Sequence, residues 1–185
     1  LCVFIVLLFR QRKAAFFIVE KLWSPVILFI VGARVESIDK EKALALTEPA
    51  IFASNHQSNF DIPAIINQTK QHLHFIAKKE IKKVPFLGQY TAAMGMIFVD
   101  RGNKMKAKES LQKAGALIKG GRDVVIFPEG TRSKDGKIHQ FKRGAFIVAK
   151  EGMVNVVPVA IKGTRKVNPS GKFRLRPGKV IVKYG

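Results

Sequence analysis

The sequence predicts an α/β fold with a mostly parallel or mixed central sheet flanked by helices, preceded by an N-terminal membrane-associated two-helix segment. From Ala50 onward, short apolar runs rich in Ile, Val and Phe alternate with helical stretches, which is typical of a largely parallel sheet covered on its faces. The almost wholly apolar N-terminus indicates contact with a membrane. We therefore expect residues 1–33 to form the membrane-associated segment and residues 34–185 to form one globular domain.

The first 33 residues are predicted to be two helices that dip into one leaflet of a membrane. Residues 1–9 are wholly apolar, residues 10–13 read RQRK, and residues 14–33 are again mostly apolar. Neither apolar run is a clean span, because a complete spanning helix needs about 20 apolar residues. The basic break and Trp23 both suit the headgroup region. A pair of core helices is the alternative, although little polar face is visible on either.

Five short apolar runs predict the strands of the sheet. They are brief, β-branched and aromatic, as buried strands are. The predicted strands are AIFAS (50–54), HFIA (74–77), MIFV (96–99), DVVIF (123–127) and VNVVPVAI (154–161).

Helices are predicted between several of these strands. Within residues 103–121 apolar residues recur at helical spacing, with Asn103 placed to cap the start and two glycines to end the helix. A second helix is expected over residues 143–151. A third is expected to open at Asp61, with Pro63 tolerated in its first turn.

The charge of the chain indicates an anionic partner. The sequence has 33 Lys and Arg against 13 Asp and Glu, a formal net charge of +20, which attracts phosphates, nucleic acid, acidic proteins or an anionic bilayer. With 185 residues, 47% of them hydrophobic, the chain can bury a sizeable core and is not of a disordered class. The single cysteine, Cys2, cannot form an internal disulfide and fits a cytoplasmic location for the globular part.

Polar residues follow the predicted strands directly, where ligands bind in parallel sheets. The first such segment, SNHQSNFD (54–61), holds a histidine five positions before an aspartate. The two cannot share a helix face, but a turn can bring the Asp61 carboxylate to the His56 ring, fix its tautomer and leave the other nitrogen free as a base. The alternative is that Asp61 caps the helix and His56 is an ordinary loop histidine.

A second polar segment, FPEGTRS (127–133), is suited to binding an anion. Gly130 allows close backbone approach, and Arg132 can hold two phosphate oxygens at once. An ordinary turn with a solvated arginine fits equally well. Arg101, in FVDRG after the third strand, has the same two interpretations.

Several common catalytic devices are missing from the sequence. No serine lies in a Gly-x-Ser-x-Gly elbow, and Cys2 is in the apolar tail, so we expect the nucleophile to come from the substrate. His72 and His74 lack a nearby third ligand, and no Walker or Gly-x-Gly-x-x-Gly loop occurs, so neither a metal nor a cofactor is expected.

Four segments, taken in order, resemble the blocks of one enzyme family, and a fifth segment lies between the first two. They are NHQSNFD (55–61), GMIFVDR (95–101), FPEGTRS (127–133) and VVPVAI (156–161), with the Lys-bearing FIAKKEI (75–81). This pattern resembles the glycerolipid acyltransferases, the lysophosphatidic acid acyltransferase or PlsC-like group, over roughly residues 34–185. The chain begins at Leu and stops at KVIVKYG, where the family's sheet is expected to continue, so we expect both ends to be incomplete.

The resemblance implies an acyltransferase catalytic domain on the cytoplasmic face of the cell membrane. It implies transfer of a fatty acyl group from an acyl thioester, acyl-CoA or acyl-ACP, to the sn-2 hydroxyl of 1-acyl-glycerol-3-phosphate, giving phosphatidic acid without an acyl-enzyme. In this pattern His56 is the general base, Asp61 holds it, and Lys78 assists near the reacting centre. The substrate-binding residues that it implies, with Glu129 organising their loop, are Arg101, Glu129, Gly130, Thr131 and Arg132.

Two kinds of alternative remain open. Within the same enzyme class, the acceptor could be glycerol-3-phosphate or another lysophospholipid, although lipid-facing helices favour an acceptor already in the bilayer. In a different class, the chain would be a basic module that binds anionic lipid or nucleic acid, as residues 162–183 suggest with eight Lys or Arg and no acid. No aromatic stacking motif or recognition helix supports nucleic acid as a partner.

Overall fold

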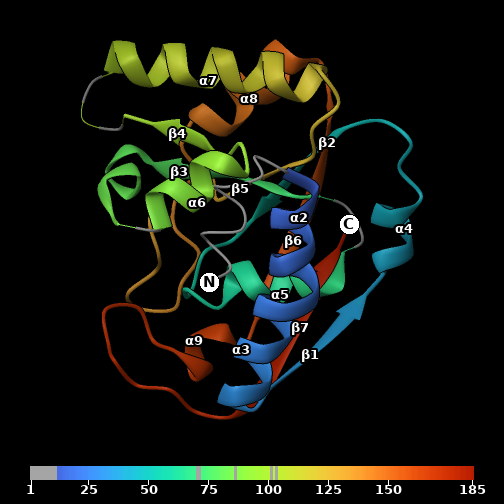
Figure 1. Cartoon of the computed structure of the whole chain (residues 1–185), viewed down its shortest axis with the longest axis vertical. Helices are drawn as coiled ribbons and strands as arrows, with labels where there is room; N and C mark the ends of the chain where they lie inside the picture. The colour runs from blue at the N-terminus through green and yellow to red at the C-terminus, as the bar shows by residue number, and fades with distance from the viewer. Residues whose placement is uncertain (1–11, 70–71, 86, 101, 103) are drawn as a thin grey trace.

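A seven-stranded mixed sheet forms the centre of the computed structural model, which describes residues 12–69, 72–85, 87–100, 102 and 104–185 (Figure 1). The strands lie in the order β1-β7-β6-β2-β5-β3-β4. Their bounds are β1 Ala33–Ile38, β2 Ala50–Ser54, β3 His74–Lys78, β4 Ile97–Val99, β5 Val124–Ile126, β6 Asn155–Lys162 and β7 Gly178–Tyr184.

Five neighbouring strands run parallel, so their carboxyl ends meet at one edge of the sheet. These are β6, β2, β5, β3 and β4, whereas β7 is antiparallel to β6 and β1 is parallel to β7. The predicted α/β fold with a mostly parallel or mixed sheet is confirmed, and all five predicted strands are present with small shifts at their ends. β1 and β7 were not among the five predicted strands. β1 reads ARVESI, in which half-exposed and exposed residues alternate without an apolar run.

Helices connect and cover the strands. α5 and α8 were expected at Asp61 and over residues 143–151, and α7 lies within 103–121, while Asn103 itself is outside the described residues. The helical elements are α2 Arg12–Phe17, η1 Ile18–Trp23, α3 Ser24–Val31, α4 Lys40–Leu44, α5 Asp61–Gln68, η2 Lys79–Lys83, α6 Leu87–Ala93, α7 Lys104–Lys119, α8 Gly144–Gly152 and α9 Thr164–Val167.

The two faces of the sheet hold separate apolar cores. On one face, Ile51, Val124 and Ile126 pack with Ile118 of α7 and Val148 of α8. On the other face, the alternate residues of the same strands pack with α5 and the N-terminal helices, in a cluster that includes Phe52, Val125, Ile65, Phe16 and Leu28. This alternation follows from the period of two along a strand, and it fixes the register of the strand ends that carry the candidate site.

The described N-terminal residues form one continuous helical run with a π turn in its middle. Ser24 donates its N–H to Val19 O, five residues back, across η1. Pro25, in the first turn of α3, has no N–H to give to the carbonyl four residues before it, which accounts for the widened turn. The first of the two predicted helices falls largely on residues 1–11, which lie outside the described part, and the division of the chain at residue 33 stays a prediction.

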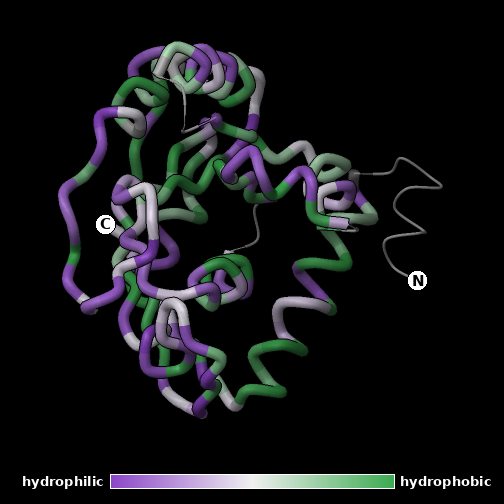
Figure 2. Tube along the Cα trace, turned by 90° about the vertical axis from the view of Figure 1, so that its left-hand side faces the viewer, coloured by the Kyte–Doolittle hydropathy of each residue, from purple (hydrophilic) through white to green (hydrophobic). Residues whose placement is uncertain are grey.

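One side of this helical run packs on the domain, and the other side is apolar and exposed. Phe16 is 4% exposed and Leu28 4%, whereas Val26 is 51%, Phe29 85% and Ile30 74% exposed. Among the described residues, Lys13–Val31 is a helix that could cross a membrane by length and composition, and 33% of it is buried in this structure. Figure 2 shows this hydrophobic rod along one side of the molecule. A core helix of a soluble protein passes the same test of length and composition, and an exposed apolar face of this kind marks a site of contact with a membrane or with another protein surface.

Asp123, at the start of β5, carries a partly buried charge whose removal is expected to stabilise the fold. Burial raises the pKa of its carboxyl, although Ala50 donates its N–H to Oδ1 at 2.9 Å. A carboxyl whose pKa is raised on folding favours the folded state only while it is protonated, so its contribution is lost as pH rises through that pKa.

We therefore expect Asp123→Asn, which keeps an acceptor for Ala50, to raise the melting temperature at neutral pH by a few degrees at most, roughly the effect of 0.5 kcal/mol. The difference should shrink below about pH 4, where aspartate is protonated in both states. Thermal melts of both proteins across this pH range would check it. A variant that is destabilised equally at all pH values would show that hydrogen-bond geometry, and not charge, dominates at this position.

Candidate active site

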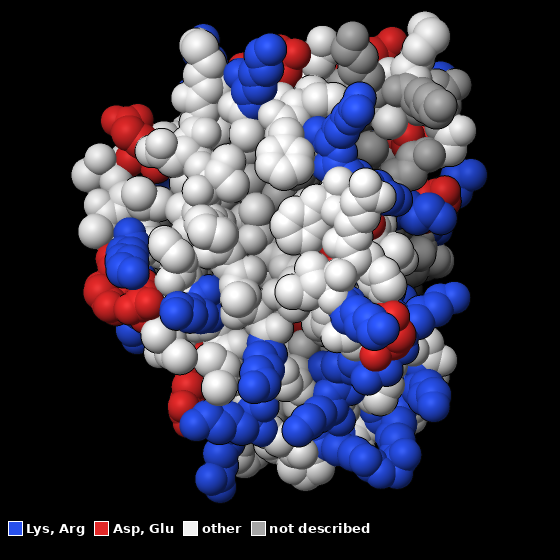
Figure 3. Space-filling view, turned by 180° about the vertical axis from the view of Figure 1, so that it is seen from behind, with Lys and Arg blue, Asp and Glu red and all other residues white. Residues whose placement is uncertain are grey.

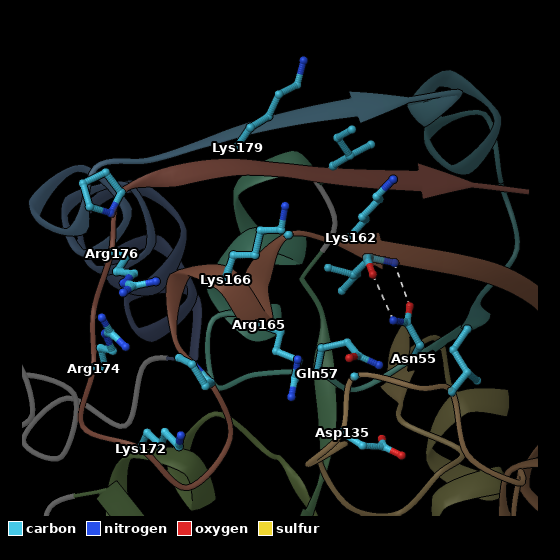
Figure 4. Close-up of a pocket in the computed structure, with 17 residues that line it drawn as sticks. Asn55, Gln57, Asp135, Lys162, Arg165, Lys166, Lys172, Arg174, Arg176 and Lys179 are labelled. Carbon is cyan, nitrogen blue, oxygen red and sulfur yellow. Dashed lines mark hydrogen bonds between the residues drawn. The ribbon is translucent and has the colours of Figure 1, made fainter.

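The site begins where β2 ends, at a loop fastened to the neighbouring strand. The Asn55 side chain donates from Nδ2 to Ile161 O at 2.9 Å and accepts the Ile161 N–H on Oδ1 at 2.7 Å (Figure 4). Its amide thereby replaces a backbone pair between β2 and β6 after β2 has left the ladder. Asn55 was not singled out from the sequence, although its place directly after a buried strand and before His56 was a usable signal.

His56 and Asp61 lie against each other, as the predicted turn required. His56 Nδ1 is 2.8 Å from Asp61 Oδ2, and the N–H groups of Gln57 and Ser58 donate to the same oxygen at 2.7 and 2.9 Å. Asp61 is fully buried at the start of α5, and its carboxylate makes no side-chain cap bond to that helix. Since an ionised carboxylate only accepts hydrogen bonds, Nδ1 carries the proton and Nε2 is left as the basic nitrogen.

An aromatic wall fixes the plane of the imidazole. The rings of His56 and Phe127 stack with centroids 3.9 Å apart and an interplanar angle of 14°, and Phe75 lies beyond Phe127 at 6.4 Å. The His56 side chain is 16% exposed, so a substrate can reach the ring. A ring that is held by a carboxylate at one nitrogen and by an aromatic face has little freedom left to lose when it acts as a base.

Glu129 binds the backbone on both sides of the site. It is 2% exposed, Oε1 accepts the His56 N–H at 2.7 Å, and Oε2 accepts the His139 N–H at 2.9 Å. Ser133 in turn donates its N–H to His56 O at 2.8 Å. The turn that follows β5 therefore bonds both the backbone N–H and the backbone C=O of His56. These bonds fit the predicted part of Glu129, which is to organise the loop.

The same turn carries the predicted anion-binding residues. Gly130 has φ +73°, a left-handed conformation that favours glycine, and an added Cβ would meet Lys142 at 3.0 Å. Arg132 donates from Nη1 to Asn59 Oδ1 at 2.7 Å, which ties its guanidinium to the loop that also bears His56. That bond uses one of the five N–H donors of a guanidinium. Thr131 is exposed in the turn between them.

A hydrogen-bonded loop after this turn was not anticipated. Asp135 Oδ1 accepts from the Lys137 N–H at 3.0 Å, from Ser133 Oγ at 2.9 Å and lies 3.0 Å from His139 Nε2. These contacts lower the pKa of Asp135 to about 2, so the carboxylate stays charged at any physiological pH. Because the contacts join residues whose spacing has no regular period, the sequence offered no pattern from which to predict them.

One predicted site residue is not brought to His56, and another falls outside the part of the chain that the structure describes. Lys78 ends β3, which β5 separates from β2, and its exposed Nζ lies 3.3 Å from Glu80 Oε1. Arg101 lies outside the described residues, directly after β4 and Asp100. No group of three or more metal-ligating side chains occurs among the residues that are described. The expectation of no metal and no cofactor stays a prediction.

Comparison with known proteins gives a consistent family. The sequence model of the acyltransferase family matches residues 34–162. The chloroplast 1-acyl-sn-glycerol-3-phosphate acyltransferase of Arabidopsis thaliana is 34% identical over 169 residues, which are 91% of this chain and 47% of that protein. A 1-acyl-sn-glycerol-3-phosphate acyltransferase of Saccharomyces cerevisiae is 32% identical over 160 residues, 85% of this chain and 52% of the other.

A solved structure is similar over most of the fold. The crystal structure of the 1-acyl-sn-glycerophosphate acyltransferase PlsC from Thermotoga maritima superposes with a TM-score of 0.81 at 32% identity, covering 94% of this chain and 68% of that one. The chain spans about half the length of the curated relatives it matches.

Proposed function

This chain belongs to the glycerolipid acyltransferase family, and from that premise we propose that it transfers a fatty acyl group to the sn-2 hydroxyl of 1-acyl-glycerol-3-phosphate, giving phosphatidic acid. The observation that carries the proposal is the His56 ring held by the buried Asp61 carboxylate, on a loop bonded to Arg132. This arrangement supports the proposal because it holds a histidine that can act as a base close to an arginine that can bind phosphate. Family membership disfavours the rival reading of a basic nucleic-acid or lipid-binding module.

In the proposed mechanism the acceptor itself is the nucleophile. His56 Nε2 takes the proton of the acceptor hydroxyl while its oxygen attacks the carbonyl carbon of the thioester. The tetrahedral intermediate then collapses, the carbon–sulfur bond breaks, and the imidazolium returns the proton to the leaving thiolate. Asp61 stabilises the imidazolium between these steps, and its three hydrogen bonds keep the carboxylate in place.

The acceptor phosphate is proposed to bind at the β5 turn. Arg132 offers donors next to the His56 loop, and Gly130 permits close backbone approach. We assign Thr131 and Arg101 to the same phosphate, and we assign Glu129 to the organisation of the loop. Lys78, exposed at the end of β3, is proposed to assist only once a substrate is bound.

The exposed helix face favours an acceptor that is already in a bilayer over soluble glycerol-3-phosphate. Val26, Phe29 and Ile30 are exposed apolar side chains that suit contact with lipid, so we propose that the protein lies on a membrane, at its cytoplasmic face. Other lysophospholipids remain the alternative acceptors. Acyl-CoA and acyl carrier protein thioesters are both candidate donors, and the high positive charge suits either because both carry anionic groups.

A direct assay tests the reaction and identifies the donor. The protein is incubated with lysophosphatidic acid and either acyl-CoA or an acyl carrier protein thioester, and phosphatidic acid is measured. Parallel incubations replace the acceptor by glycerol-3-phosphate or lysophosphatidylcholine. If no product forms with either donor and any of these acceptors, the proposed activity of this chain is refuted.

Arg132→Ala is expected to raise the KM for lysophosphatidic acid by about 10- to 100-fold with a smaller change in kcat, because a charge-assisted bond to phosphate is worth about 1.5–3 kcal/mol. Arg132→Lys is the matched control, since it keeps the charge and loses the two-pronged geometry. We expect it to fall between the alanine variant and the natural protein. An unchanged acceptor KM in Arg132→Ala would remove this residue from the phosphate site.

A further inference from the structure

A basic hollow of about 960 Å³ lies beside the His56 loop and is not used by the proposed reaction. Asn55 and Gln57 form part of its wall, and Asp135 is the acidic residue among its described lining. Figure 4 shows Arg174 and Arg176 along one side of it, with Lys166 near them. Its cations, apart from Lys179, which pairs with Glu36 at 2.8 Å, are Lys162, Arg165, Lys166, Lys172, Arg174 and Arg176.

The segment between α9 and β7 turns two different faces outward. Residues 172–176 read KFRLR, so basic and apolar side chains alternate. Lys172, Arg174 and Arg176 line the hollow, whereas Phe173 is fully exposed and Leu175 is 56% exposed. Successive side chains of an extended segment point to opposite sides, which accounts for this separation. Phe173, which is fully exposed, and Leu175, which is more than half exposed, lie next to arginines, and this combination suits a partner that is both apolar and anionic.

This segment is held in place by a buried asparagine. Asn168, 7% exposed, donates from Nδ2 to Lys172 O at 3.0 Å and to Arg174 O at 3.1 Å. Arg176 donates its N–H to Val167 O at 2.9 Å. Ser58, in the His56 loop, donates its hydroxyl to Asn168 O at 2.7 Å. The backbone of residues 172–176 is therefore fastened to Asn168 and, through it, to the His56 loop. The outward direction of Phe173 follows from these bonds.

The segment ends beside the exposed face of α3. Gly178 donates its N–H to Gly32 O at 3.2 Å, and Phe29 and Pro177 line one shallow hollow. Figure 1 shows the chain between α9 and β7 passing the end of α3, at the opposite end of the molecule from α7 and α8. The surface seen from behind carries a dense group of Lys and Arg at that same end (Figure 3). Ile30, one residue after Phe29, is 74% exposed.

We propose that residues 172–176 are a second membrane-contact segment, in which Phe173 and Leu175 enter the interface of an anionic bilayer, while Lys172, Arg174 and Arg176, on the hollow side of the segment, bind the phosphate of a lipid that reaches into the hollow. Aromatic and aliphatic side chains suit the interfacial region, and each cation near an anionic surface adds to the attraction. Together with α3 it gives the protein two points of contact. The hollow and the His56 loop are thereby held at the level of the lipid headgroups.

The inference rests on the proposed membrane association of α3. Vesicle binding by variants of the full chain tests the contact through α3 and the contact through residues 172–176 separately. Vesicles of phosphatidylcholine with phosphatidylglycerol are sedimented with the protein, and bound protein is measured. The Phe173→Ser/Leu175→Ser double variant should bind about 10- to 100-fold more weakly. This is the effect of losing two apolar side chains that are partly buried in the bilayer when the protein is bound. The matched control is Phe146→Ser, because Phe146 is 58% exposed on α8 at the other end of the molecule. Its affinity should equal that of the natural protein.

Charge variants give an independent readout. Arg174→Gln/Arg176→Gln should weaken binding to vesicles that contain phosphatidylglycerol and leave binding to pure phosphatidylcholine unchanged. Equal binding by the double apolar variant and the natural protein would overturn the inference, and so would a loss that Phe146→Ser shares. If Phe29→Ser then still weakened binding, membrane association through α3 would stand alone. Weaker binding of soluble coenzyme A with unaltered vesicle binding would assign the hollow to the donor and refute the lipid contact.

Discussion

Replacing His56 by alanine is expected to lower the turnover number by at least 10²- to 10⁴-fold, roughly 3–5 kcal/mol of activation free energy, which is the usual contribution of a positioned general base. The reason is that His56 Nδ1 lies against Asp61, so that Nε2 is the nitrogen that the proposed mechanism uses as the base. Thermal stability should change little by comparison, since the ring makes its main contacts with Phe127 and Asp61 and neither is displaced. Turnover is measured with lysophosphatidic acid and the preferred donor, at saturating concentrations of both.

The chain contains a matched control for this experiment. His72 also has its Nδ1 2.8 Å from a carboxylate oxygen, that of Glu20, and it also stacks on a phenylalanine, Phe16, at 4.6 Å. It lies before β3 at the opposite end of that strand from Lys78, so it is remote from the edge where ligands bind. His72→Ala should therefore keep nearly full activity. If both variants lost activity equally, a general effect on folding would explain the loss, and retained activity in His56→Ala would remove the base assignment.

The sheet that positions these residues could be predicted largely from local patterns. Runs such as AIFAS and DVVIF are buried on both faces and keep an unbroken apolar signal, which is why β2 and β5 were found. In β1 and β7 the less exposed side chains fall on alternate positions, and these two strands form the part of the sheet that reverses direction. Their pairing depends on contacts between residues 33 and 178, which local spacing does not encode.

In the candidate site, too, some contacts could be predicted from local sequence and others depend on distant parts of the chain. The contact between His56 and Asp61 could be predicted, because the two are five residues apart and a single turn joins them. The bonds from Asn55 to Ile161 and from Ser58 to Asn168 span 106 and 110 residues, so only the assembled fold shows them. Both residues lie inside the predicted motif, whose small polar residues prove to be the ones that fasten the loop to distant strands and turns.

Asp61→Asn is the second change with a large expected effect, and it tests the charge of the carboxylate separately from its shape. The asparagine oxygen can still accept the N–H groups of Gln57 and Ser58, so the turn should keep its form and the protein should fold. The imidazolium that forms during transfer would lose its negative partner. We expect kcat to fall by about 10²- to 10⁴-fold with little change in the acceptor KM.

The alanine variant at the same position separates catalysis from stability. Asp61→Ala leaves two buried backbone N–H groups without their acceptor, at a cost of about 1–3 kcal/mol each, so it should lower the melting temperature far more than Asp61→Asn does. Because Asp61 Oδ1 is buried and has no described hydrogen-bond partner, the asparagine NH₂ group placed there is unsatisfied and accounts for a smaller loss of stability. An asparagine variant with natural turnover would show that Asp61 only shapes the loop, since the charge would then contribute nothing to the transfer step. A variant that folds, binds the acceptor and turns over slowly is the result that a carboxylate acting through the imidazole requires.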